Sequence, residues 1–410
     1  MERTNLAVIT SGFLPVPPTK GGAVENLLYN LVKRNEIEKK INFTIFSIYD
    51  KKAEQEAKKL EYTKMIFFKS NWLVKLCDRL IYILAKYVLR KENSQSYRFI
   101  IQRLDYLNKV SKELKKNNYD KVLLENHPTQ YLALKWRKNY EKYKGRYYYH
   151  CHNEFPKKYN CENIITNTNK FIVVSNYIAD YLKRYLNLKE NQVEVLKNTI
   201  DIELFNKKLN DEEKNKIKKE LKIDSNKKII LYAGRLVKEK GIKELLLALK
   251  NVKYENYVLL VVGGSLSGIK NKTKFENEIE KYILDLGDKV RLIGYIPYEE
   301  MYKYYGISDF AVLPSTWNEP AGLTMLEAQI CDTPVITTNA GGIPEYISSK
   351  SAFLLNNDDN LTKNLSKKIE ELLCNDAEIT KMKNNIKVNQ KYENIEEYYN
   401  EFYKIIDETY

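Results

Sequence analysis

The sequence predicts an α/β protein made of two doubly wound, Rossmann-like domains, each built on a parallel sheet with helices on both faces. Short apolar runs alternate with helix-like stretches along the whole chain, which is the order that parallel sheets require. This alternation stops and then restarts in the second half of the chain. The length of 410 residues is sufficient for two or three domains with buried cores.

The first series of strands predicts an N-terminal domain over residues 1–205. Its predicted strands are Asn5–Thr10, Asn42–Ile48, Met65–Lys69, Lys121–Glu125, Tyr147–His150 and Phe171–Ser175. A helix is expected from about Ala23 to Arg34. Residues 70–116 interrupt the series as a long, basic insertion whose apolar residues have helical spacing.

The second series predicts a C-terminal domain over residues 206–390. Its strands are Lys227–Ala233, Tyr257–Gly263, Val290–Ile293, Phe310–Pro314 and Pro334–Thr337, with a helix at Gly241–Leu249. The charged stretch Asn206–Lys219 is poor in apolar residues and is interpreted as a linker region. Ligands of such sheets bind beyond the carboxyl ends of the strands, so we expect a cleft that the two domains face.

Residues 391–410 carry an apolar stripe at helical spacing, formed by Tyr392, Ile395, Tyr399, Phe402 and Ile406. Such a stripe is a packing face. It predicts a C-terminal helix that packs back on the N-terminal domain.

The composition excludes several classes of protein. Hydrophobic residues make up 43% and charged residues 30%, which favours a globular over a disordered chain. The five cysteines include no C-x-x-C, which argues against a disulfide framework and a zinc ribbon. Neither a signal peptide nor an apolar run of about 20 residues is recognisable, so we expect a cytoplasmic protein.

The positive charge is concentrated in one half of the chain. The net charge is +14, with about +17 in residues 1–200 and about −3 in residues 201–410. Such asymmetry indicates an anionic partner for the first half, although a lysine-rich surface without a partner is the alternative. The insertion is apolar on one side and basic on the other, which suits an anionic membrane or, alternatively, packing on the first domain. Nucleic acid is not expected, because no nucleic-acid-binding motif is present.

The most specific motif is EPAGLTMLE, residues 319–327, which follows the strand FAVLPS and opens a helix. Gly322 and Leu323 are expected at the helix N-terminus, where free N–H groups favour an anion such as phosphate. Glu319 is expected in the loop, pointing into the cleft, and Glu327 about a turn inside the helix. Carboxylates accept hydrogen bonds from the hydroxyls of sugar and ribose, although two solvated glutamates are the alternative.

A second motif, GRLVKEKG at residues 234–241, also lies between a strand and a helix. Arg235 and Lys240 are expected to converge on one anion at the carboxyl end of the strand, and their donors suit a diphosphate. A solvated basic turn is the alternative. Neither the P-loop pattern G-x-x-x-x-G-K-[ST] nor G-x-G-x-x-G occurs, which argues against a P-loop ATPase and a dehydrogenase.

Two weaker signals lie in the first domain. Gly21 and Gly22 follow the first strand, where paired glycines let a backbone approach a ligand closely, although a simple turn is the more common explanation of such a pair. His150 and His152 project to the same face of a strand. Without a third ligand at clear spacing, we favour a hydrogen-bonding histidine over a metal ligand. The chain also has no D-x-D, the usual carboxylate clamp for a divalent metal on a nucleotide diphosphate.

Taken together, these segments resemble the retaining glycosyltransferases of family 4, which have the GT-B fold. The resemblance spans nearly the whole chain and is stronger in the second domain. It is carried by the GG pair, HNE, GRLVKEKG, EPAGLTMLE and PVITTNAGGIPEYI, with VSNYIADYL and LKNTIDIELF before the boundary. The most similar subgroup includes spore-coat protein SA and polysaccharide-assembly enzymes.

The resemblance implies a role for each matched residue. Arg235 and Lys240 would hold the donor diphosphate, Glu327 the ribose hydroxyls and Glu319 the hydroxyls of the donor sugar. His152 would bond to the reacting sugar. Backbone contacts with the donor are implied for Gly21, Gly22, Ile296, Ala321, Gly322 and Leu323. The family often has an aromatic residue in place of Ala321, so the donor preference stays open.

The activity implied is that of a metal-independent hexosyltransferase (EC 2.4) without a cofactor. The donor would be a nucleotide-sugar, most simply a UDP-sugar, and the acceptor a glycan or lipid-linked molecule of a bacterial surface polysaccharide. The protein would work in the cytoplasm, peripherally at the inner face of the membrane. The alternatives are another GT-B enzyme, such as a nucleotide-sugar epimerase, and a non-catalytic coat or assembly protein. A phosphorylase is less favoured because no buried Schiff-base lysine is recognisable.

Overall fold

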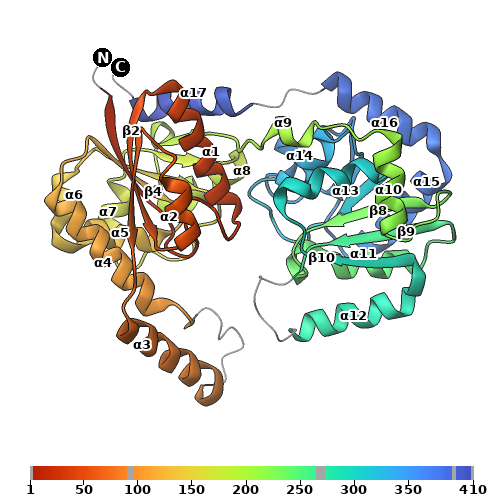
Figure 1. Ribbon diagram of the computed structural model, residues 1–410, viewed down its shortest axis with the longest axis horizontal. Coiled ribbons are helices and arrows are strands. Elements are labelled where there is room, and N and C mark those ends of the chain that lie inside the picture. Colours follow the sequence, from red (N-terminus) through yellow and green to blue (C-terminus); the bar gives the residue numbers. More distant parts are fainter. Residues whose placement is uncertain (1–2, 90–96, 265–272, 390–393, 408–410) are drawn as a thin grey trace. The chain divides into compact units, whose positions relative to one another are not determined.

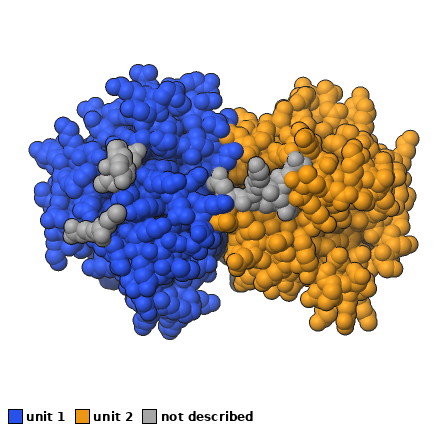
Figure 2. Space-filling model, turned by 90° about the horizontal axis from the view of Figure 1, so that it is seen from above, with its two compact units in different colours: residues 1–198, 395–410 blue, residues 199–394 orange. Residues whose placement is uncertain are grey.

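The computed structural model describes residues 3–89, 97–264, 273–389 and 394–407 and divides the chain into two compact units (Figure 2). Unit 1 comprises residues 1–198 and 395–410, and unit 2 comprises residues 199–394. Each unit contains one parallel sheet with helices on both faces (Figure 1). The predicted fold class is therefore confirmed.

Unit 1 contains a seven-stranded sheet in the order β3-β2-β1-β4-β5-β6-β7, in which all neighbours are parallel. Its strands are β1 (Thr4–Ile9), β2 (Ile41–Ile48), β3 (Thr63–Phe68), β4 (Lys121–Glu125), β5 (Tyr147–Cys151), β6 (Phe171–Val173) and β7 (Val193–Val195). The apolar residues of β1 from Leu6 to Ile9 are fully buried, as expected for a strand covered on both sides.

The helices of unit 1 connect these strands or lie between them. They are α1 (Ala23–Glu38), α2 (Lys51–Ala57), α3 (Trp72–Ile83), the π-helix η1 (Leu84–Val88), α4 (Ile100–Lys116), α5 (Tyr131–Lys135), α6 (Asn139–Lys142), α7 (Glu162–Thr166) and α8 (Asn176–Leu186). The predicted insertion therefore forms α3, η1 and α4. In Figure 1, α3 projects away from the rest of the unit beyond the end of α4.

The last helix of the chain, α17 (Ile395–Asp407), also belongs to unit 1 and lies beside α1 (Figure 1). The hydroxyl of Tyr399 donates to Asn35 Oδ1 at 2.7 Å, and Thr4 Oγ1 donates to Asp407 Oδ1 at 3.0 Å. The buried residues of α17 join the core beneath α1; they are Tyr398, Tyr399, Phe402 and Ile406. Tyr392 of the predicted stripe lies outside the described residues.

Unit 2 contains a six-stranded parallel sheet in the order β10-β9-β8-β11-β12-β13. Its strands are β8 (Lys228–Ala233), β9 (Tyr257–Val262), β10 (Val290–Gly294), β11 (Phe310–Leu313), β12 (Val335–Thr338) and β13 (Ala352–Leu355). Its helices are α9 (Ile202–Phe205), α10 (Asp211–Glu220), α11 (Ile242–Leu249), α12 (Lys274–Leu286), α13 (Met301–Ile307), α14 (Leu323–Ile330), α15 (Leu361–Cys374) and α16 (Asp376–Asn389).

The interpretation of Asn206–Lys219 as a linker region is wrong, because most of this stretch forms helix α10 within unit 2. The helix begins with a capping box, in which the side chains of Asn210 and Glu213 each accept from the other's backbone N–H. Ile217 packs against the unit 2 core and anchors the charged helix.

In each sheet the strand order reverses once, because successive strands are added first on one side of the first strand and then on the other. The reversal lies between β1 and β4 in unit 1 and between β8 and β11 in unit 2. At such a switch point the loops that leave neighbouring strands diverge, and ligands of open α/β sheets bind there. The predicted motifs follow β1, β5, β8 and β11, which are the strands at or next to these points. In the part of the chain that the structure describes, no helix is both long and apolar enough to cross a membrane.

Candidate functional site

The loop after β8 is held at both ends by one buried tyrosine. The hydroxyl of Tyr232 donates toward the carbonyl oxygens of Arg235 (3.1 Å) and Lys240 (3.4 Å), which closes residues 235–240 into a compact turn. Gly241 ends this turn with φ +68°, and a Cβ there would lie 1.8 Å from the carbonyl oxygen of Pro314. The missing side chain therefore lets the turn lie directly against the end of β11.

This turn brings Lys240 to Glu319, the first residue of the EPAGLTMLE motif. Lys240 Nζ donates to Glu319 Oε1 at 2.5 Å, and only 8% of the Glu319 side chain is exposed. The structure therefore joins two residues that belong to separate motifs in the sequence. Arg235 is exposed, and its guanidinium has no hydrogen bond or ion pair to the described residues.

The backbone of Glu319 is fixed by the segment after β12. Glu319 forms an isolated parallel bridge with Gly341, and Gly342 donates its N–H to the Glu319 carbonyl at 2.7 Å. Gly341 has φ +62°, and a Cβ there would lie 2.4 Å from the same carbonyl oxygen. The AGG sequence therefore sets the position of Glu319, because no larger residue fits so close to it.

The predicted helix start is confirmed: α14 begins at Leu323, with Gly322 as its N-cap. No side chain among the described residues caps this end, so the first N–H groups of the helix keep their capacity to bind an acceptor. Ala321 is half-buried, directly before the cap. Helix N-termini of this kind favour anions.

Glu327 lies on the second turn of α14 and is buried. The hydroxyl of Tyr305 donates to its Oε2 at 3.0 Å, while burial raises the pKa of Glu327 to about 7. A buried carboxylate with one hydrogen bond has lone pairs left for hydroxyl donors. Ile296 is half-buried and packs on the same apolar core that lies beneath α14.

The raised pKa of Glu327 has a measurable consequence for stability. In the unfolded chain this group ionises near 4.5 and in the folded protein near 7, so the unfolded state binds fewer protons between these values. The free energy of unfolding should therefore fall by about 3 kcal/mol as the pH rises through this window.

We expect Glu327→Gln to abolish this pH-dependent part of the unfolding free energy and to be more stable than the wild type at pH 8. Urea unfolding across the pH range measures it, with Glu239→Gln on the exposed loop as control. An unchanged pH slope in Glu327→Gln would contradict the assignment.

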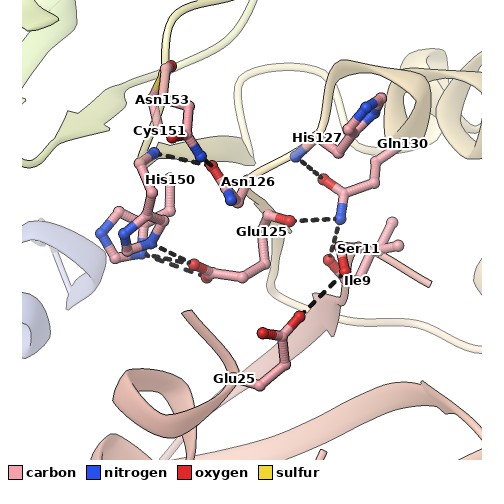
Figure 3. A network of polar contacts seen from close by, with 11 residues as sticks. Ile9, Ser11, Glu25, Glu125, Asn126, His127, Gln130, His150, Cys151 and Asn153 are labelled. Carbon is pink, nitrogen blue, oxygen red and sulfur yellow. Dashed lines mark hydrogen bonds and ion pairs between the residues drawn. The ribbon is translucent and has the colours of Figure 1, made fainter. Parts of the chain in front are cut away.

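Unit 1 holds a second cluster, made of Glu125, His150 and His152 (Figure 3). The sheet register places Glu125, the last residue of β4, beside His150 on β5. His150 Nδ1 lies 3.1 Å and His152 Nε2 2.7 Å from Glu125 Oε1, and all three side chains are buried. Below, this group is called the Glu125 cluster.

The charges of the Glu125 cluster follow from its burial and contacts. Burial alone would raise the pKa of Glu125, but attraction and hydrogen bonds from His150 and His152 lower it to about 2. Burial lowers the pKa of His152 to about 4. At neutral pH a neutral His152 therefore donates its Nε2–H to an ionised carboxylate, which fixes the tautomer and the orientation of the ring.

Sequence reasoning missed Glu125, because a carboxylate at the end of the strand KVLLE looks like an ordinary strand terminus. The sequence shows no third ligand at clear spacing, but in the structure Glu125 contacts both histidines. The 2.7 Å contact suits a hydrogen bond. The same three side chains also form a group that could hold a metal ion, so the hydrogen-bonding role of His152 stays a prediction.

The first turn of α1 contains a further carboxylate, Glu25, which had not been expected near the site. Gly21 and Gly22 have φ +75° and +110°, and Gly22 is the N-cap of α1. The side chain of Glu25 folds back over this end, where it accepts a hydrogen bond from Ser11 Oγ at 3.2 Å (Figure 3). Burial raises the pKa of Glu25. The helix end that follows the paired glycines therefore already holds a carboxylate.

Comparisons with known proteins agree for both halves of the chain. Residues 213–390 match the family model "Glycosyl transferases group 1", and residues 56–204 match "Glycosyltransferase Family 4". Spore coat protein SA of Bacillus subtilis (strain 168) is 25% identical over 386 residues, which cover 90% of this chain and 89% of that protein. The capsular polysaccharide biosynthesis glycosyltransferase CapM of Staphylococcus aureus is 31% identical over 46% of this chain and 48% of its own.

The fold is shared with solved structures at low sequence identity. Alr3699/HepE of Anabaena, crystallised with UDP and glucose, superposes with a TM-score of 0.70 at 16% identity, covering 99% of this chain and 100% of that chain. This likeness shows the GT-B architecture of two parallel-sheet units. The two family models, in turn, support a glycosyltransferase.

Proposed function

We propose that this chain, with its GT-B fold and its matches to glycosyltransferase models in both halves, is a retaining, metal-independent hexosyltransferase. It would move a sugar from a nucleotide-sugar, most simply a UDP-sugar, to a glycan or lipid-linked acceptor in bacterial surface polysaccharide assembly. The observation that carries this proposal is the contact between Lys240 and the buried Glu319 next to the uncapped start of α14.

Cationic side chains and backbone N–H groups of unit 2 suit the diphosphate of the nucleotide-sugar. Lys240 supplies a compact positive charge, Arg235 has an exposed guanidinium free for a ligand, and the amides of Gly322 and Leu323 begin α14. Such groups stabilise the negative charge that grows on a departing diphosphate. We assign them this role, which a divalent metal has in other glycosyltransferases, because D-x-D is absent.

Carboxylates of the same unit suit the hydroxyls of the donor. Glu319 would accept from the sugar and Glu327 from the ribose, while the backbones of Ile296 and Ala321 would contact the base and the sugar. In unit 1, His152 is assigned a hydrogen bond to the reacting sugar, and Gly21 and Gly22 a backbone approach to the donor. The similarity to a UDP-binding structure supports the choice of a UDP-sugar.

The chemistry is a substitution that retains the configuration at the anomeric carbon. The bond between this carbon and the diphosphate oxygen breaks, and its electron pair leaves with the diphosphate. The acceptor hydroxyl oxygen forms the new bond on the same face, and its proton passes to the leaving phosphate. No side chain of the assigned set is a nucleophile in this scheme, so its residues bind, orient and stabilise charge.

The proposal is tested with a panel of UDP-, GDP- and ADP-sugars in the presence of EDTA. Thermal stabilisation by a nucleotide identifies the donor class, and product analysis by NMR then reports transfer or slow hydrolysis and the anomeric configuration. Full activity with EDTA and a retained anomer are expected. An epimerised free nucleotide-sugar would indicate the epimerase alternative, and no stabilisation by any nucleotide would indicate a non-catalytic coat or assembly protein.

The location is part of the same proposal. We place the protein in the cytoplasm, peripherally at the inner face of the membrane, where a lipid-linked acceptor is available. The positive charge of residues 1–200 supports a position at an anionic membrane surface.

A further inference from the structure

The outward face of α3 and η1 is apolar, although it is in contact with solvent. Its exposed side chains are Trp72, Leu73, Leu76, Leu80, Ile83, Leu84, Tyr87 and Val88. Each of them is between 41% and 70% exposed, and their spacing puts them on one side of the helix. Below, this set is called the α3 surface. A helix of a globular protein normally packs such an apolar stripe against the core. A contiguous exposed face of eight apolar side chains therefore indicates a binding site.

The opposite side of α3 faces α4 and is narrow. Ala85 and Asp78 are buried there, and Asp78 is the only acidic residue between Trp72 and Leu89. Its carboxylate accepts hydrogen bonds from the backbone N–H groups of Ile101 (2.8 Å) and Gln102 (2.9 Å) at the start of α4. The carboxylate of Asp78 is therefore hydrogen-bonded inside the unit and adds no negative charge to the exposed face.

Basic residues lie along one edge of the α3 surface. Lys75 and Arg79 are four residues apart and Lys86 follows seven later, so all three lie on one side of the helix and are exposed. In the described segments, none of the three has a carboxylate partner. The Lys86 ammonium instead lies over the rings of Tyr82 (5.7 Å) and Tyr87 (5.0 Å).

We propose that the α3 surface binds the interface of an anionic membrane, with its leucines and Trp72 among the acyl chains and its basic edge at the headgroups. An apolar area beside cations that have no carboxylate partner among the described residues is complementary to acyl chains beneath anionic headgroups. A second copy of this chain would present the same basic edge and would place like charges together. The inference rests on the proposed function in one respect, because membrane binding would bring the enzyme to a lipid-linked acceptor. Binding to the membrane itself requires neither donor nor acceptor.

Flotation of the full chain with lipid vesicles tests the proposal at low salt. Vesicles of phosphatidylglycerol and phosphatidylcholine should bind the protein, and vesicles of phosphatidylcholine alone should bind it much more weakly. We expect Lys75→Gln/Arg79→Gln to lower the binding constant about fivefold per removed charge. Leu80→Glu should lower it by about tenfold or more. The fluorescence of Trp72 should shift to the blue on binding, and Trp72→Phe should remove that shift.

The chain offers matched controls in unit 2, where Leu284 is 74% exposed on α12 and Lys216 and Lys219 are exposed on α10. Leu284→Glu and Lys216→Gln/Lys219→Gln should bind like the wild type. Equal binding by the α3 variants and these controls would overturn the proposal. So would a concentration-dependent dimer that Leu80→Glu disperses, because a second copy would then cover the face. Since flotation is measured without substrates, its failure is distinguishable from a failure of the transferase assay.

Discussion

Replacement of Lys240 by alanine should lower kcat with the UDP-sugar by about 10²- to 10³-fold. Lys240 is the cation nearest to the buried Glu319, and in the proposed reaction it faces the charge that develops on the leaving diphosphate. Its removal withdraws that stabilisation mainly in the transition state, so the effect on KM should be smaller than the effect on kcat. Steady-state kinetics with the donor that the nucleotide-sugar panel selects measures both.

Lys238→Ala is the matched control, because Lys238 lies on the same turn and is exposed. It should leave kcat unchanged. Lys240→Ala also leaves Glu319 as a buried carboxylate without its cation, which destabilises the fold. The double variant Lys240→Ala/Glu319→Gln should recover stability but not turnover. Wild-type kcat in a folded Lys240→Ala protein would refute the assignment of this cluster to the diphosphate.

Replacement of Glu125 by alanine should lower kcat by about 10²-fold, with little change in the KM for the donor. The variant removes the acceptor that orients His152, so the ring loses its fixed tautomer and position. It should also destabilise unit 1 by about 1–3 kcal/mol for each buried imidazole nitrogen left without a partner.

Glu125→Gln separates orientation from stability, since the amide keeps one acceptor oxygen and nearly the same shape. We expect a smaller loss of kcat and near-normal stability. The ¹⁵N shifts of His152 should report the Nε2–H tautomer in the wild type and a mixture in Glu125→Ala. Glu194→Ala, at the surface of β7, is the control. A Glu125→Ala protein that is unstable but keeps the wild-type kcat would show that the Glu125 cluster is purely structural.

The sequence predicted the fold class because short apolar runs, such as those in KVLLE and YVLLVV, need cover on both sides and alternate with helix-like stretches. It did not predict β7 and β13, which have three and four residues and lie at the sheet edges. It also misread α10, whose single well-packed apolar residue gives no periodicity, although the capping box Asn210–Glu213 was a local signal for a helix.

For the candidate site, local signals were sufficient where a motif opens a helix. The start of α14 and the placement of Glu327 one turn inside it follow from glycine and proline chemistry at a strand–helix junction. The contacts of Glu125 with His150 and His152 depend on the register between β4 and β5, and the contact of Lys240 with Glu319 depends on two glycines that bring separate loops together. Such long-range pairings are not encoded in the spacing of residues along one segment. The roles of these residues in catalysis stay predictions until the variants are measured.

Helix α17 has a consequence for how the protein is made. It contributes Tyr398, Tyr399, Phe402 and Ile406 to the same core as Leu6 and Val8 of the first strand. During synthesis, the core of unit 1 therefore stays incomplete until residues 395–407 have left the ribosome. Unit 2, whose residues are contiguous, has no such delay, so the half that is translated first should complete its folding last.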